Sequence, residues 1–188
     1  MSNALSSLPG AALAALHPFA TDAAAPLRGF TVRAARPAPA HLVLEYALEG
    51  DLEQVRFPLP AAPDPGPTDG LWRHTCMEAF VGSPSPGPYL EFNFATSGQW
   101  AAYRFSGYRE GMAPLTGIRP PRIEVRTQSD QLLLSADLEL PAQLAAGHLR
   151  LALTAVVENV QGQLAYWAQR HAPGRPDFHH PHSFVLEI

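Results

Sequence analysis

The chain has a single cysteine, Cys76, among its 188 residues. One cysteine excludes any disulfide bond within the chain, and such scarcity is typical of proteins from a reducing compartment. No recognisable neighbouring motif activates this thiol, so we expect Cys76 to be a small buried hydrophobic residue and not a nucleophile. The sequence therefore predicts a cytoplasmic protein without disulfides.

Strong positive charge and long apolar runs are also missing. Thirteen Lys and Arg stand against 17 Asp and Glu, which gives a net charge of −4, and no polybasic run occurs. Nucleic acid and membrane are therefore not expected as partners. No apolar stretch has the length of a membrane span. Residues 1–16 are apolar but lack a basic beginning and contain Pro9, so we expect a short N-terminal helix or arm and no secretion signal.

Three familiar functional motifs are absent as well. The chain contains no G-x-S-x-G, no G-x-x-x-x-G-K-[ST] and no G-x-G-x-x-G sequence. These motifs mark the serine nucleophile of many hydrolases, the phosphate-binding loop and the dinucleotide-binding turn. The sequence therefore gives no signal for those three classes of site, and we expect no cofactor.

Proline and two-residue alternation, by contrast, are abundant. Twenty prolines, well above the usual ~5%, lie between apolar stretches, where they do least harm to a β-ladder. About eleven segments alternate apolar and other residues as strands do: 29–36, 41–50, 53–58, 75–82, 89–96, 99–105, 121–127, 131–140, 148–158, 163–170 and 183–188. We expect one all-β domain over residues 1–188, a two-sheet antiparallel β-sandwich of jelly-roll-like form, with residues 1–16 as its arm.

Residues 71–80, LWRHTCMEAF, carry many reactive side chains in one short segment. As a strand from Thr75 onward, this segment points Cys76, Glu78 and Phe80 to one face, and Met77, Ala79 and Val81 to the other. Trp72 falls at the rim of that strand. Arg73 and His74 have no assigned role.

Three predicted strands each carry a polar or indole pair at strand spacing. The pairs are Glu91 with Asn93, Trp100 with Arg104, and Trp167 with Gln169. If they share one concave sheet face, they would suit a neutral sugar, because polar groups bind hydroxyls and flat aromatic rings pack on the sugar ring. The alternative is structural: Glu91 and Arg104 form an ion pair and the tryptophans fill the core. A third possibility is acid/base glycoside chemistry by Glu78 and Glu91.

The tail, RHAPGRPDFHHPHSF, is rich in histidine. Metal ions need three or four such donors, and His179, His180 and His182 are secondary candidates for them. Their spacing matches no established metal motif and prolines interrupt the segment, so we expect a rim loop and no bound metal. His171 from this tail joins the ligand-binding candidates.

Three segments, DGLWRHTCMEAFVG, YLEFNFATSGQWAAYRFSGYREGM and LAYWAQRHAPGRPDFHHPHSF, resemble the bacterial DOMON-like domain proteins, a group similar to the family-nine carbohydrate-binding modules. The resemblance covers about residue 16 to 188. It implies a β-sandwich whose concave sheet face clamps a sugar between two tryptophans, which would be Trp72 and Trp167. Glu78 looks like the assisting carboxylate, and Arg104 and Asn93 look like the arginine and the amide.

The leading hypothesis is therefore a non-enzymatic module that binds a small carbohydrate or sugar-like ligand. Its binding residues would be Trp72, Glu78, Glu91, Asn93, Arg104, Trp167 and His171. The alternatives are a metal-dependent or acid/base enzyme acting on a sugar-like substrate, and a protein-interaction module. Related DOMON domains bind heme through methionine and histidine, so a heme site using Met77 is a further alternative.

Overall fold

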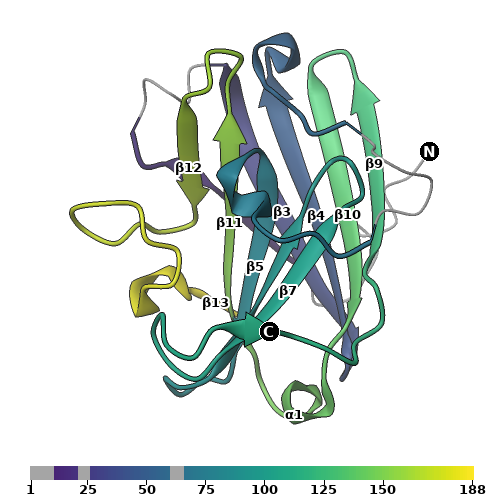
Figure 1. Cartoon of the computed structure of the whole chain (residues 1–188), viewed down its shortest axis with the longest axis vertical. Helices are drawn as coiled ribbons and strands as arrows, with labels where there is room; N and C mark the ends of the chain where they lie inside the picture. Colours follow the sequence, from purple (N-terminus) through teal and green to yellow (C-terminus); the bar gives the residue numbers. More distant parts are fainter. Residues whose placement is uncertain (1–10, 21–25, 60–65) are drawn as a thin grey trace.

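Two antiparallel β-sheets pack face to face in the computed structural model, which describes residues 11–20, 26–59 and 66–188 (Figure 1). The five-stranded sheet has the order β1 (Ala12–Ala15), β3 (Leu27–Ala38), β4 (His41–Gly50), β10 (Gln131–Glu139) and β9 (Arg122–Gln128). The eight-stranded sheet has the order β2 (His17–Pro18), β12 (Leu164–Ala168), β11 (Arg150–Glu158), β5 (Cys76–Gly82), β6 (Tyr89–Phe94), β7 (Trp100–Phe105) and β8 (Ala113–Pro114), and β13 (Leu186–Glu187) also pairs with β11. This arrangement confirms the predicted all-β sandwich.

Helical structure in the described residues is confined to short turns. They are the 3₁₀ turns η2 (Leu52–Gln54), η3 (Leu71–Arg73) and η4 (Pro181–Ser183) and the single α-helical turn α1 (Ala142–Ala145). No helix of the described part is long and apolar enough to cross a bilayer.

One predicted strand is wrong, and the predicted N-terminal segment takes the second of its two expected forms. The expected strand 53–58 begins in η2 and, within the described residues, forms a single bridge, between Val55 and Asn159. Residues 1–16 were expected to form a short helix or arm, and Ala12–Ala15 form the edge strand β1, in which Ala14 pairs with Val32 of β3. Pairing with a sheet edge outweighs the helix propensity of alanine, which is only a weak preference. Residues 1–10 of that segment lie outside the described residues.

The main core lies between the two sheets and follows the predicted alternation. Leu42, Leu44, Tyr46 and Leu48 of β4 are fully buried there. They face Met77, Ala79 and Val81 of β5, as expected for one face of a strand. The Tyr46 hydroxyl donates a hydrogen bond across the sandwich to the backbone oxygen of Glu78, at 2.7 Å.

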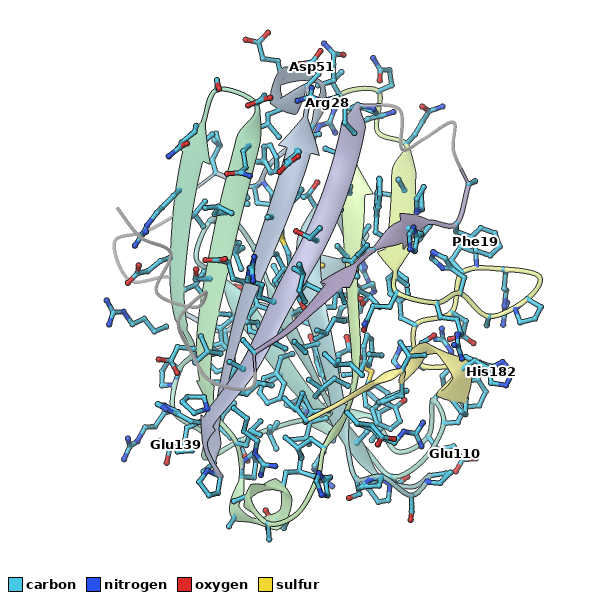
Figure 2. All side chains as sticks on the ribbon, turned by 180° about the vertical axis from the view of Figure 1, so that it is seen from behind. Phe19, Arg28, Asp51, Glu110, Glu139 and His182 are labelled. Atoms are coloured by element: carbon cyan, nitrogen blue, oxygen red, sulfur yellow. The ribbon has the colours of Figure 1, made fainter. Side chains whose placement is uncertain are left out.

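The eight-stranded sheet is buried on its outer face as well. Every residue of β5 is buried, including Cys76, Glu78 and Phe80, which point away from the main core. The C-terminal tail, yellow in Figure 1, lies beside β11 and β12. Figure 2 shows His182 of this tail and Glu110, from the loop after β7, along the same edge of the molecule. The two segments help enclose a pocket on the outer face.

Candidate functional site

A pocket of about 320 Å³ opens on the outer face of the eight-stranded sheet, and we call it the outer pocket. Its size is in the lower range of small-molecule sites. Strands β5, β6, β7, β11 and β12 supply its floor, while η3, the loop after β7 and the tail supply its walls. The residues that line it are Trp72, Glu78, Phe80, Glu91, Phe105, Arg109, Met112, Val156, Tyr166, Pro176, Phe178 and His179.

The strand register places the polar floor of the outer pocket. Glu78 of β5 pairs with Asn93 of β6, and Phe80 pairs with Glu91, one strand step further along. Side chains two residues apart share a face, so the two carboxyl groups are diagonal neighbours on adjacent strands. The sequence-predicted residues Glu78, Glu91 and Asn93 therefore lie together.

Glu78 is almost completely buried, with 2% of its surface exposed. One carboxylate oxygen accepts the weak Sγ–H of Cys76 at 3.5 Å, and the other accepts the Thr154 hydroxyl at 3.2 Å. Burial, followed by repulsion from Glu91, raises the pKa of Glu78 to about 8. The carboxyl group is therefore largely protonated at neutral pH while the pocket is empty.

Glu91 accepts one hydrogen bond, which is shorter than either of those to Glu78. Its Oε1 accepts a hydrogen bond from the Asn93 side-chain amide at 2.8 Å. Burial raises the pKa of Glu91 to about 7, although the Asn93 hydrogen bond and the charge of Arg109 act in the opposite direction. Both carboxyl groups thus change charge near neutral pH, which is common at functional sites.

His179 reaches from the tail into the outer pocket, where its ring packs against Phe80 and Phe105. The backbone N–H of Arg109 donates to the Tyr89 hydroxyl oxygen at 3.3 Å, and this hydroxyl lies 2.8 Å from His179 Nδ1. If the Tyr89 hydroxyl donates to Nδ1, the ring proton is on Nε2, which lies 3.8 Å from Glu91 Oε2. Burial and the nearby Arg109 lower the pKa of His179 to about 4, so the ring is neutral at physiological pH.

Tyr108, Arg109 and Asp177 form a hydrogen-bonded group at the mouth of the outer pocket, which we call the Asp177 cluster. Arg109 donates to Asp177 Oδ1 from Nη2 at 2.8 Å and from Nε at 3.2 Å, and the Tyr108 hydroxyl donates to Oδ2. Burial alone would raise the pKa of Asp177, but these hydrogen bonds lower it below its ordinary value. The cluster joins the loop after β7 to the tail.

Trp72 lies on the wall of the outer pocket, as its predicted place at the strand rim suggests. The turn η3 carries it, and Gly70 begins that turn in the left-handed conformation at φ 80°. The half-buried indole meets the Tyr103 ring edge to face at 5.6 Å between centroids. The Tyr103 hydroxyl donates to Asp69 at 2.5 Å and holds the approach to the turn.

Trp167 does not face Trp72, so the predicted two-tryptophan clamp does not form. Trp167 is 4% exposed and belongs to the core between the sheets, where its ring lies 5.7 Å from that of Phe30. It pairs with Ala155, which pairs in turn with Met77 on the core face. Trp72 packs with the outer-face residues instead. The two indoles are on opposite faces of one sheet.

Arg104 is the second predicted ligand-binding residue outside the pocket. It is exposed and shares a face of β7 with Trp100 and Ala102, which lie in the main core. The residue that pairs with Glu91 on β7 is Tyr103. The expected grouping of Arg104 with Glu91 and Asn93 on one sheet face is therefore wrong.

The remaining histidine candidates do not gather at one point. His171 Nε2 contacts the backbone oxygen of His17 at 2.7 Å, and its ring lies beside Phe19 and Phe178. His180 and His182 contact each other, with ring centroids 4.6 Å apart. Within residues 11–20, 26–59 and 66–188, no group of three or more His, Cys, Asp or Glu is placed to hold a metal ion.

His74, which the sequence left without a role, has a structural partner. Its Nδ1 lies 2.7 Å from Glu158 Oε2, and Arg56 donates to the other oxygen of the same carboxylate at 2.8 Å. Glu158 is buried, and these contacts supply its polar partners. Met77, the candidate heme ligand, is fully buried between the sheets and has no access to the outer pocket.

Arg109, Asp177 and Phe178 are parts of the site that the sequence did not single out. They lie in irregular segments, where alternation does not predict which side chains share a face. The only signal was the crowding of polar and aromatic residues in 106–112 and 171–184. Their convergence depends on how two loops distant in sequence cross the sheet.

No protein-family model matches the chain, and no curated protein sequence matches it. A solved structure described as a candidate carbohydrate-binding protein from Bacteroides uniformis aligns with a TM-score of 0.68 at 16% sequence identity, over 95% of this chain and 85% of the other. The two proteins share a fold. At 16% identity, this similarity supports a common architecture but does not identify a ligand site.

Proposed function

We propose that the chain binds a small carbohydrate or similar polyhydroxylated molecule in the outer pocket. The observation that carries the proposal is the pairing of a half-buried indole, Trp72, with the carboxyl groups of Glu78 and Glu91 in one pocket. A sugar offers an apolar C–H face to an aromatic ring and hydroxyls to hydrogen-bonding groups. The fold shared with a candidate carbohydrate-binding protein supports the proposal.

The proposed contacts differ from those expected from the sequence. Glu78, Glu91 and Trp72 remain ligand contacts, with Asn93 supporting Glu91. His179 and the aromatic residues Tyr166 and Phe178 take the place of Trp167 and Arg104. The DOMON-like resemblance, the jelly-roll-like description and the cytoplasmic location stay predictions from the sequence.

Two tryptophan variants separate this proposal from the original clamp. Trp72→Ala removes the aromatic wall and is expected to weaken sugar binding at least tenfold, by analogy with other buried aromatic anchors. Trp167→Phe keeps an aromatic ring in the core and should leave affinity unchanged. Calorimetric titration with a panel of mono- and disaccharides measures both. Loss of binding in Trp167→Phe with retention in Trp72→Ala would contradict the proposed site.

One observation favours a second candidate function, acid/base chemistry on a sugar-like substrate. Glu78 and Glu91 share a pocket, and burial is the main cause that raises the pKa of each, to about 8 and about 7. Glycoside hydrolysis uses a pair of carboxyl groups, of which one acts as the acid and the other as a base or nucleophile. The same titrations distinguish the two functions, because an enzyme would convert the ligand and a binding module would leave it intact.

A further inference from the structure

The floor of the outer pocket has more hydrogen-bond acceptors than donors. Glu78 receives only the Cys76 thiol and the Thr154 hydroxyl, and Glu91 receives the Asn93 amide. Within the described ranges, no Arg forms an ion pair with either carboxyl group. With both carboxyl groups ionised, the floor therefore has spare acceptor capacity that faces the ligand space.

The cationic groups near this floor are committed elsewhere or neutral. The guanidinium of Arg109 is bound to Asp177 through two of its nitrogens. His179 contacts Glu91 Oε2 only at 3.8 Å and is uncharged at neutral pH, because its pKa is lowered to about 4. The charge of Arg109 acts on Glu91 from a distance, but no cationic side chain of the described residues forms a hydrogen bond with either carboxyl group.

Asn93 gives an independent sign of a missing donor. It is fully buried on the same sheet face as the carboxyl groups, and Glu78 is its direct pairing partner across the strands. Its Nδ2 donates to Glu91, but its Oδ1 has no hydrogen-bond partner among the described residues. An unpaired buried acceptor is unfavourable, so a donor brought close to this group would relieve it.

The aromatic lining of the outer pocket suits a cation as well. Trp72 and Phe178 stand in its walls, and the floor strands add Phe80, Phe105 and Tyr166. Aromatic rings attract ammonium groups electrostatically, most strongly where water is excluded. An ammonium group also has three donors and no acceptor, which matches an acceptor-rich floor.

We infer that the ligand of the outer pocket carries an amino group, as an amino sugar does, and that this group binds beside Glu78 and Glu91. The inference rests on the proposed function and specifies its ligand class. A protonated amine would form hydrogen bonds with the carboxylates in which both partners are charged, whereas the hydroxyls of a neutral sugar bring no charge of their own.

Proton release provides a signature of this binding mode. The pKa of Glu78 is about 8 and that of Glu91 about 7, so the empty pocket retains protons on these groups at neutral pH. An ammonium group favours the carboxylate forms and displaces them. The other titratable or charged groups around this pair on the outer face are Cys76 from β5, Tyr89 from β6, Tyr103 from β7, Tyr166 from β12, Arg109 from the loop after β7, and Asp177 and His179 from the tail. Tyr46 of the opposite sheet approaches Glu78 from the core side, where its hydroxyl donates to the backbone oxygen.

The test compares glucosamine, galactosamine and mannosamine with the parent hexoses and their N-acetyl forms. Calorimetry at pH 7 in two buffers of different ionisation enthalpy measures affinity and proton release together. We expect at least one amine to bind roughly tenfold tighter than its parent hexose, with protons released. Parent hexoses that bind as tightly as the amines would overturn this inference and leave the proposed function standing. Failure of every sugar to bind would overturn both.

A substitution then locates the amino group. Glu91→Gln should reduce the preference for the amine to about twofold or less, because the amine loses an ion pair and the parent hexose loses only one hydrogen bond to a charged acceptor. The exposed Glu53→Gln, far from the pocket, is the matched control and should change nothing. A full preference in Glu91→Gln would contradict the inference. If that variant does not fold, the wild-type preference itself should decline between pH 8 and pH 5 as the carboxylates take up protons, and a constant preference would contradict it.

Discussion

At the scale of single residues, the buried carboxyl groups of the outer pocket are the most unusual feature of this protein. Glu91 sits on a sheet face that packs against rings, and among the described residues its direct partners are an amide and a neutral imidazole. Burial therefore favours its protonated form. A folded-state pKa of about 7 lies above the ordinary value of 4.5. This difference links the protonation of Glu91 to the stability of the fold.

We expect Glu91→Gln to remove part of the pH dependence of stability. Above pH 4.5 the unfolded chain loses this proton while the folded chain keeps it, so the free energy of unfolding falls as pH rises toward 7. Glutamine has no proton to lose. At pH 9 the variant should exceed the wild type by roughly 2 kcal/mol, while at pH 4.5 the two should be similar. Urea denaturation across this range measures the difference, with Glu53→Gln as the control. A constant difference at all pH values would contradict the account of Glu91.

His179 acts in the opposite direction. Its folded-state pKa of about 4 lies below the ordinary 6.5, so its contribution to stability is lost as pH falls through that interval. Glu91→Gln leaves His179 in place but removes the carboxyl group that lies 3.8 Å from its Nε2. The substitution also removes the repulsion that helps raise the pKa of Glu78, so the difference from the wild type reports Glu91 together with the groups coupled to it.

At the scale of elements, alternation along each strand reliably predicted which residues share a face. It placed Glu78 opposite Met77 on β5, and Glu91 opposite Phe92 on β6, as the structure confirms. Alternation tells which residues share a face and not which face meets the other sheet. Trp167 and Arg104 were therefore assigned to the ligand side although register puts Trp167 in line with Met77. A period of two is symmetric, so only pairing with neighbours resolves it.

The Asp177 cluster is the element-scale device that holds the loop after β7 and the tail together. Asp177→Asn keeps the shape of the side chain and removes its charge. We expect a loss of about 1.5 kcal/mol of stability, typical of hydrogen bonds to charged groups. Amide hydrogen exchange in residues 106–112 and 176–183 should accelerate, and ligand affinity should weaken because two walls of the pocket loosen.

Asp130→Asn is the matched control for this substitution. Asp130 pairs with Arg28 at 2.5 Å, but both side chains are more than half exposed and lie far from the pocket. Exposed ion pairs contribute little to stability. Equal effects of the two substitutions, or exchange that stays slow in both pocket segments of Asp177→Asn, would contradict the role of the cluster.

At the scale of the whole molecule, the sequence predicted the β-sandwich but did not predict which residues come together in the outer pocket. Leucine alternation in 41–50 and 131–140 was sufficient to predict a two-layer β protein. The outer pocket depends on contacts between segments that are distant in the sequence. Arg109 and Asp177 meet across 68 positions, and no local pattern encodes such a meeting.

The two faces of the eight-stranded sheet carry different tryptophans. Trp100 and Trp167 belong to the core between the sheets, whereas Trp72 lines the outer pocket. The chain has three tryptophans, so each contributes one indole N–H. These groups report separately on the two faces of the eight-stranded sheet.

The most direct test of the central claim is therefore a ¹H–¹⁵N spectrum of the indole groups during titration with the sugars and amino sugars. Trp72→Phe and Trp167→Phe assign the signals. The proposed site predicts that the Trp72 signal shifts in a saturable manner while those of Trp100 and Trp167 remain in place. A saturable shift of Trp167 with Trp72 unmoved, or no shift of any indole at millimolar ligand, would contradict it.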